Sequence, residues 1–324
     1  MAVIVARLHL YPPDHNAGAE WMVHSMLRAL VARGHRCEVW LSRYSATSEP
    51  YDIDGVYVWP FGSGRGWTES VHDSDAVLTH LENTPVAAVG ARRGGRPLII
   101  VNHNTHPLTK RWARAGADLL VHNSQWMRDD IGVDGLIVRP PVFAEEYATT
   151  PGECITLVNL IEAKGADTFY QLAKRFPDRK FLGVIGAYGE QDIRAYGNVE
   201  IVRHTSGHFM RDEVYGRTRI LLMPSSYESW GRCGVEAMAS GIPVIAHPTP
   251  GLRESLGSAG LFADRVDVDR WASTVECLDD PKVYAEQSDA AKRRVAELDP
   301  TEDLRTWCDA VEALTEGSNA HGRR

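Results

Sequence analysis

The sequence predicts an α/β fold of two doubly wound parallel sheets, each with helices on both faces. Short apolar runs alternate with helical stretches along both halves of the chain, and this alternation is typical of parallel strands joined by helical crossovers. The pattern restarts near residue 154, after a stretch (140–153) with prolines near both ends. The 324 residues also suffice for two domains of about 150 residues each. We therefore expect domains at 1–148 and 149–324.

The first domain opens on an apolar run that predicts a strand. Its residues, "AVIVARLHL", lack the basic stretch, long apolar core and cleavage site of a signal peptide. A helix is expected over residues 19–34, and short apolar runs follow it. The strands expected in this half are residues 2–10, 36–42, 55–61, 74–81, 97–103, 117–124 and 135–141.

The second domain repeats the pattern. One helix is expected over residues 166–176, and another starts near Gly231 and is ended by Gly241 and Pro243. The buried face of the latter helix consists of Val235, Met238 and Ala239. The strands expected in this half are residues 154–160, 180–186, 199–204, 220–226 and 243–247.

Two glutamates flank the start of the helix at Gly231. Pro224 and two serines close the preceding strand, so Glu228 falls in the loop at its carboxyl end, whereas Glu236 lies on the helix. The first amides of a helix carry a partial positive charge, and Gly231 has no side chain to block an approaching anion. Carboxylates accept hydrogen bonds from paired hydroxyls. The sequence therefore predicts a site for a sugar–phosphate–sugar compound, in a cleft at the carboxyl ends of the strands.

Motifs along nearly the whole chain resemble one known family. "AGAEWMVHSMLRALVARGHRCEVW" is similar to its glycine-rich loop, first helix and second strand, and "SDAVLTH" and "PLIIVNH" are similar to two of its histidine-ended strands. In the second half "KGAD", "VIGAYG", "PSSYESWG" and "VEAMASGIPVIA" follow in the family's order. The chain thus resembles the retaining nucleotide-sugar glycosyltransferases of family 4. This resemblance implies the GT-B fold, two Rossmann-like domains facing across a cleft, with the last helix packing back on the first domain.

The resemblance also implies roles for single residues. Glu236 would hold the ribose hydroxyls of the donor, Glu228 the hydroxyls of its sugar, and Lys164 the diphosphate. Gly18 would let the acceptor or a phosphate approach the backbone, and His103 would face the donor sugar. The catalytic residues implied are His103, Lys164 and Glu228. The donor-binding residues implied are Gly18, Asn159, Lys164, Arg203, Glu228, Ser229, Trp230, Gly231, Arg232 and Glu236.

Two positions depart from the family pattern. Asn159 stands where the family usually has an arginine, and Ala17 replaces the first glycine of the loop. Arg232 or Arg203 would then substitute on the diphosphate. These departures leave open a non-catalytic nucleotide-sugar-binding protein, and the fold leaves open a nucleotide-sugar epimerase or a phosphorylase.

The mechanism implied by the resemblance is front-face displacement with retention, without a metal or another cofactor. His103, His106 and His122 lie near one another in the sequence, but no carboxylate or cysteine completes a spaced ligand set. The partner expected is therefore a nucleotide-diphosphate sugar as donor. The acceptor stays open among a small molecule, a lipid, a protein and modified DNA.

Charge and cysteine content set the expected compartment. The net charge of −8 gives no overall attraction to nucleic acid, and no apolar run is long enough to span a membrane. The five cysteines are scattered and odd in number, which is typical of free thiols in a reducing, cytoplasmic setting. One basic cluster is interpreted as a solvated surface, in preference to a site of weak contact with an anionic surface. It consists of Arg92, Arg93, Arg96, Lys110, Arg111 and Arg114.

Overall fold

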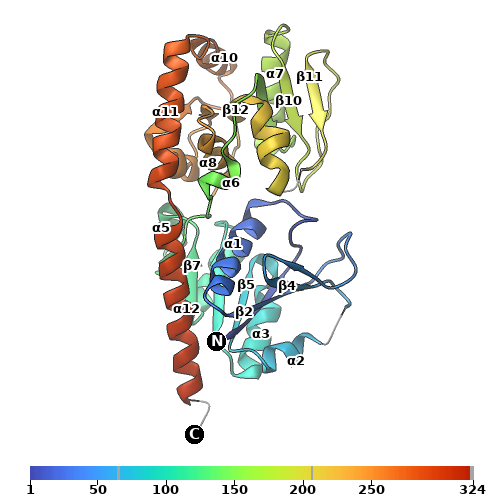
Figure 1. The fold of residues 1–324 in the computed structure, drawn as a ribbon, viewed down its shortest axis with the longest axis vertical. Helices are drawn as coiled ribbons and strands as arrows, with labels where there is room; N and C mark the ends of the chain where they lie inside the picture. The colour runs from blue at the N-terminus through green and yellow to red at the C-terminus, as the bar shows by residue number, and fades with distance from the viewer. Residues whose placement is uncertain (64–65, 206, 322–324) are drawn as a thin grey trace. The chain divides into compact units, whose positions relative to one another are not determined.

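The computed structural model describes residues 1–63, 66–205 and 207–321 (Figure 1). Its internal contacts divide the chain into two compact units. Unit 1 comprises Met1–His15, Ala19–Pro141 and the described part of Pro300–Arg324, and unit 2 comprises Asn16–Gly18 and Val142–Asp299.

This division starts unit 2 at Val142, before the expected boundary after residue 148, and it groups the last helix with unit 1, as the resemblance implies. Val142 and Tyr147 are buried in the core of unit 2, where Ser240 Oγ donates a hydrogen bond to the Tyr147 carbonyl at 3.0 Å. At the other end, Trp307 is fully buried and its indole N–H donates to the Met26 carbonyl in unit 1 at 3.0 Å. Apolar burial thus assigns residues 142–148 to unit 2 and the last helix to unit 1.

Unit 1 contains an eight-stranded sheet in the order β3-β4-β2-β1-β5-β6-β7-β8, in which β3 pairs antiparallel with β4 and the other neighbours run parallel. Its strands are β1 (Val3–Leu8), β2 (Arg36–Leu41), β3 (Tyr51–Ile53), β4 (Val56–Trp59), β5 (Ala76–His80), β6 (Leu98–Asn102), β7 (Leu119–His122) and β8 (Leu136–Ile137). Its helices are α1 (Gly18–Ala32), α2 (Trp67–His72), α3 (Thr84–Gly94), α4 (Pro107–Ala115), α5 (Gln125–Ile131) and α12 (Thr301–His321), of which α1 starts on residue 18 of unit 2.

Unit 2 contains a six-stranded parallel sheet in the order β11-β10-β9-β12-β13-β14. Its strands are β9 (Cys154–Val158), β10 (Phe181–Val184), β11 (Val199–Val202), β12 (Thr218–Met223), β13 (Val244–Ala246) and β14 (Gly260–Phe262). Its helices are α6 (Ala144–Tyr147), α7 (Ala166–Arg175), α8 (Arg232–Ala239), α9 (Pro250–Leu256), α10 (Val268–Cys277) and α11 (Pro281–Glu297). The two sheets confirm the predicted α/β class.

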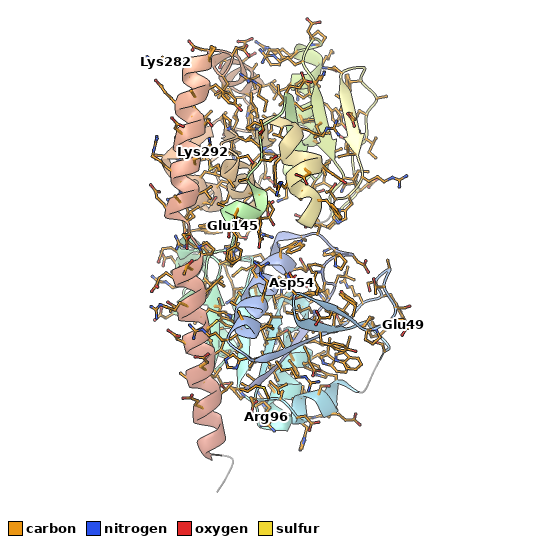
Figure 2. The ribbon with its side chains drawn as sticks, in the orientation of Figure 1. Glu49, Asp54, Arg96, Glu145, Lys282 and Lys292 are labelled. Atoms are coloured by element: carbon orange, nitrogen blue, oxygen red, sulfur yellow. The ribbon has the colours of Figure 1, made fainter. Side chains whose placement is uncertain are left out.

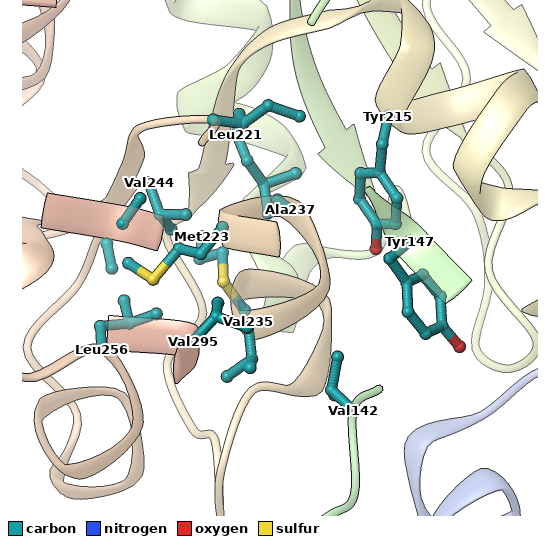
Figure 3. Packing of buried hydrophobic residues seen from close by; sticks show 14 of the residues in the cluster. Val142, Tyr147, Tyr215, Leu221, Met223, Val235, Ala237, Val244, Leu256 and Val295 are labelled. Carbon is teal, nitrogen blue, oxygen red and sulfur yellow. The ribbon is translucent and has the colours of Figure 1, made fainter. Parts of the chain in front are cut away.

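The core of unit 2 shows why its sheet is covered on both faces. Leu221 and Met223 of β12 pack in one apolar cluster with α8, α9 and α11 (Figure 3). Ile220 and Leu222 point to the other face, where they join a second cluster with α7 and α10. Successive side chains of a strand alternate between faces, so a strand buried on both sides reads as a continuous apolar run. This explains why "ILLM" was readable as a buried strand.

Candidate active site

Two loops of unit 2 follow the neighbouring strands β9 and β12, so both lie at the carboxyl edge of the sheet. They are bonded to each other, because the Ser226 amide donates to the Ala163 carbonyl at 2.9 Å. Gly165 has a φ of +87°, and a β-carbon there would lie 2.9 Å from the Pro224 carbonyl oxygen. Only glycine tolerates both the left-handed backbone and this close approach. The two loops therefore hold a fixed relation to each other.

These loops bring Lys164 and Glu228 into direct contact. The Lys164 ammonium donates to the Glu228 carboxylate, and Ser225 Oγ donates to the same oxygen at 2.9 Å. Burial alone would lower the pKa of Lys164, but the charge and hydrogen bond of Glu228, together with Tyr188 and Cys233, raise that pKa above its usual value. Lys164 therefore carries its charge at neutral pH, which the role expected for it at a diphosphate requires.

Glu236 faces a buried polar network. The Tyr215 hydroxyl donates to Glu236 Oε2 at 2.5 Å, and Arg232 Nε lies 3.2 Å from Glu236 Oε1. Arg232 also donates from Nη2 to the Tyr147 hydroxyl at 2.9 Å. The structure thus directs the Arg232 guanidinium to Glu236 and Tyr147, which differs from the expected use on the diphosphate.

The predicted start of α8 near Gly231 is confirmed, and the structure gives two further reasons for a glycine there. Gly231 is its N-cap with a φ of +88°, and a β-carbon there would overlap Leu252. Glycine is therefore required by backbone and packing, whether or not an anion approaches. Two more of the expected donor-binding residues precede it: Trp230 is buried and its carbonyl accepts from Ser255 Oγ at 2.6 Å, and Ser229 is partly buried.

Asn159 and Arg203 are two further residues that the resemblance implies for donor binding. Asn159 has a φ of +70°, which asparagine tolerates better than most residues, and its side-chain oxygen accepts from Gln191 Nε2 at 2.9 Å. Arg203 follows β11 and its side chain is exposed. The position where the family usually has an arginine is therefore filled here by a turn residue held within the protein.

Unit 1 supplies the predicted histidine. His103 follows β6, is buried, and packs edge-on against His80, with ring centroids 4.9 Å apart. Burial lowers the pKa of His103 to about 3 and lowers that of His80 as well. Both rings are therefore neutral at physiological pH, so each offers one donor and one acceptor. Gly18 begins α1, one residue before the expected start, and belongs to unit 2.

The low pKa of His103 predicts a pH-dependent stability. An unfolded histidine titrates near 6.5, so between that pH and about 3 the unfolded state binds more protons than the folded state. This contribution is present above pH 6.5 and is lost as the pH falls. The free energy of unfolding, measured with urea, should fall between pH 7 and pH 5. This fall should be about 2 kcal/mol smaller in His103→Gln than in wild type. An equal drop in both proteins would contradict the assignment.

Sequence reasoning missed three residues of this site. Ser225 contacts Glu228, and Tyr147 and Tyr215 complete the network at Glu236. Tyr215 opens a 3₁₀ turn (Tyr215–Arg217) in an irregular stretch without apolar periodicity, and Tyr147 lies in the proline-bounded stretch expected to be a linker. The only sequence signal for either tyrosine is the residue type itself.

The basic cluster is partly occupied by local contacts. Arg96, labelled in Figure 2, donates to the His72 carbonyl at 2.5 Å, and Lys110 pairs with Asp130 at 2.8 Å. Arg114 donates to the Ile131 carbonyl at 3.3 Å. Arg92 and Arg93 are exposed near the end of α3, and Arg111 is exposed on α4. Three of the six side chains thus support the fold of unit 1.

Two features are absent from the part of the chain that the structure describes. Across residues 1–63, 66–205 and 207–321, no helix has both the length and the apolar character that a membrane span requires. Within the same ranges, no three histidine, cysteine, aspartate or glutamate side chains gather in a group suited to a metal ion.

Family models match both halves of the chain. The model described as Glycosyltransferase Family 4 matches residues 16–136, and the model described as Glycosyl transferases group 1 matches residues 145–294. The second match contains the Lys164–Glu228 pair and Glu236.

The curated relatives include a glycogen synthase and a D-inositol 3-phosphate glycosyltransferase. Glycogen synthase of Mycobacterium tuberculosis (strain H37Rv) is 25% identical over 283 residues, which cover 74% of this chain and 68% of that protein. D-inositol 3-phosphate glycosyltransferase of Mycobacterium sp. (strain KMS) is 27% identical over 278 residues. That alignment covers 73% of this chain and 61% of the relative, so the chain spans less than two thirds of that relative's length.

Solved structures share the fold at low sequence identity. Sucrose-phosphate synthase from Thermosynechococcus elongatus matches with a TM-score of 0.77 and 15% identity over 99% of this chain and 100% of that chain. Anabaena HepE in complex with UDP-glucose matches with a TM-score of 0.78 and 16% identity over 97% of this chain and 100% of that chain. The chain is therefore a nucleotide-sugar-dependent glycosyltransferase similar to those of family 4, with the GT-B fold.

Proposed function

We propose that the protein transfers a sugar from a nucleotide-diphosphate sugar to an acceptor hydroxyl with retention of configuration, without a metal ion. The observation that carries this proposal is the contact between Lys164 and Glu228, beside a helix that carries Glu236, at the carboxyl edge of one parallel sheet. The HepE structure with UDP-glucose supports this class of donor. No other cofactor takes part.

Binding of the donor would break the Lys164–Glu228 ion pair and give each of the two side chains a partner on the donor. Its diphosphate takes over the Lys164 ammonium, and the freed Glu228 carboxylate accepts hydrogen bonds from hydroxyls of the sugar. Backbone amides at the start of α8, from Ser229 to Arg232, add partial positive charge at the phosphates. Ribose hydroxyls bind Glu236. Of the remaining candidates, Arg203 is exposed after β11 and is free to reach a phosphate, whereas Asn159 is held by Gln191.

The chemical step breaks the bond between the anomeric carbon and the leaving phosphate oxygen. The acceptor oxygen forms the new bond on the same face, and its proton passes to the leaving phosphate oxygen. Charge grows on the diphosphate as the bond breaks, so a fixed ammonium and fixed amides stabilise the transition state more than the bound donor. The neutral His103 ring would hold a hydroxyl of the donor sugar, and Gly18 would give the acceptor or a phosphate access to the backbone.

Product stereochemistry tests the proposal. Proton NMR of a product made with EDTA present should show the donor's anomeric configuration, at the rate found without EDTA. An inverted product, or activity lost with EDTA and restored by a divalent cation, would overturn it. Incubation of the donor without acceptor separates transfer and slow hydrolysis from epimerisation. If Glu228→Ala abolishes that hydrolysis, the non-catalytic alternative is rejected.

A further inference from the structure

A chain of four buried polar side chains joins three elements of unit 2. Tyr147 comes from α6, Arg232 and Glu236 come from α8, and Tyr215 comes from the 3₁₀ turn before β12. Tyr215 is fully buried, and the other three are at most 8% exposed. Figure 3 shows both tyrosine rings beside α8, where their centroids lie 6.2 Å apart in an edge-on arrangement. Two hydrogen bonds from Tyr215 and Arg232 and the ion pair between Arg232 and Glu236 hold this network together.

We propose that Tyr215 and Arg232 are positioning residues that orient the Glu236 carboxylate for the two ribose hydroxyls of the donor, and that Tyr147 orients Arg232. This inference rests on the proposed function, because it takes Glu236 as the ribose-binding residue.

The hydrogen-bond geometry at Glu236 supports it. An ionised carboxylate has about four acceptor positions, two on each oxygen. The Tyr215 hydroxyl occupies one on Oε2 at 2.5 Å, and Arg232 Nε lies 3.2 Å from Oε1 as an ion-pair partner. At least one acceptor position is therefore left on each oxygen, which matches the two hydroxyls of a cis-diol. Because both protein donors are fixed by packing, the carboxylate loses little further freedom when ribose binds.

The contacts of Arg232 decide between two uses of that side chain. A guanidinium aimed at the diphosphate would direct its donors outward from α8. Instead Nε faces Glu236 and Nη2 donates to the Tyr147 hydroxyl at 2.9 Å, and the residue is 8% exposed. Its positive charge also offsets the cost of burying the carboxylate. Arg232 therefore acts on the nucleotide through Glu236.

Tyr215→Phe removes one hydroxyl and tests the proposal with a matched pair of ligands. The probes are whichever of UDP, GDP and ADP wild type binds most tightly, and the 2′,3′-dideoxy form of that nucleotide. Calorimetry should show a Kd for the ribonucleotide raised about tenfold in the variant. For the dideoxy nucleotide, the two proteins should agree within about twofold, because the group that Glu236 would hold is absent.

Tyr170→Phe is the matched control. Tyr170 is also fully buried in unit 2, and its hydroxyl donates to the Asp192 carbonyl at 2.8 Å, away from Glu236. This variant loses that bond and the one that the Tyr170 hydroxyl accepts from the Arg194 amide at 3.1 Å, and it should bind both nucleotides as wild type does. If the two tyrosine variants weaken ribonucleotide binding equally, the effect is general destabilisation and the proposal is wrong.

Arg232→Gln tests the second positioning residue with a third probe, the nucleoside without phosphates. If Arg232 acts through Glu236, the variant weakens binding of the nucleoside as much as that of the diphosphate, and it leaves the dideoxy diphosphate unaffected. If Arg232→Gln binds the nucleoside as tightly as wild type does, Arg232 acts on the diphosphate, and its assignment as a positioning residue is wrong. If wild type binds none of the nucleotides, the proposed function fails. If wild type binds them, but the variants lose as much affinity for the dideoxy nucleotide as for the ribonucleotide, only this inference fails.

Discussion

Replacing Lys164 with alanine is expected to lower kcat by about 10²–10³-fold, the usual effect of removing one fixed donor to a developing negative charge. The ammonium is held by Glu228 in a mostly buried site, and its raised pKa keeps it charged over the whole working range of pH. Charge grows on the diphosphate as the glycosidic bond breaks, so the loss should appear mainly in kcat and less in the KM of the donor.

Steady-state kinetics with saturating donor measures this effect, and Lys174→Ala is the control. Lys174 is exposed on α7 in the same unit, so its removal should leave kcat unchanged. Lys164→Arg keeps the charge but changes its geometry, and it should retain part of the activity. If Lys164→Ala binds the donor normally and turns over at the wild-type rate, the leaving diphosphate is stabilised by other groups.

Gly251→Ala is expected to damage the site without touching a reacting group. A β-carbon on Gly251 would lie 2.6 Å from the Ser229 carbonyl oxygen and would overlap the Glu228 carbonyl oxygen. These are backbone atoms, which cannot rotate away, so the loop that carries Glu228 must shift. Overpacking of this kind costs about 1–3 kcal/mol of stability, and a displacement near 1 Å at a catalytic loop costs about 10²-fold in rate.

Gly197→Ala provides the comparison, because a β-carbon at Gly197 would meet no atom within 4 Å. Urea unfolding and kcat/KM measured on both variants separate the effect of the clash from the chemical change itself. We expect Gly197→Ala to match wild type in both. Wild-type kcat/KM in Gly251→Ala would mean that the position of this loop has no influence on catalysis.

The sequence predicted the buried strands because their apolar runs are continuous. The run around Leu221 and the restart at Cys154 were both readable in this way, and both became central strands of unit 2. The strands β3 and β14 were not predicted. Each has three residues, lies at an edge of its sheet and contains residues that are not fully buried, so neither produces a periodic pattern.

The loop position of Glu228 and the start of α8 at Arg232 were predictable from local signals, because Pro224 and Gly231 punctuate the chain. The contacts of Glu236 and Arg232 were not, since Tyr215 lies 21 residues from Glu236 and Tyr147 lies 85 residues from Arg232, and each reaches its partner only through tertiary packing. The direction of the Arg232 side chain toward both Glu236 and Tyr147 was unpredictable for the same reason. A sequence records the charge of a side chain, whereas its direction depends on partners brought together by the fold.

The most direct measurement is a calorimetric titration of wild type, Glu228→Ala and Glu236→Ala with UDP-, GDP- and ADP-linked sugars. Wild type should bind at least one of them, and each substitution should weaken that binding by more than about tenfold, because each removes charged hydrogen bonds to the donor. No heat from any donor with folded wild type, or unchanged affinity in both variants, would contradict the account.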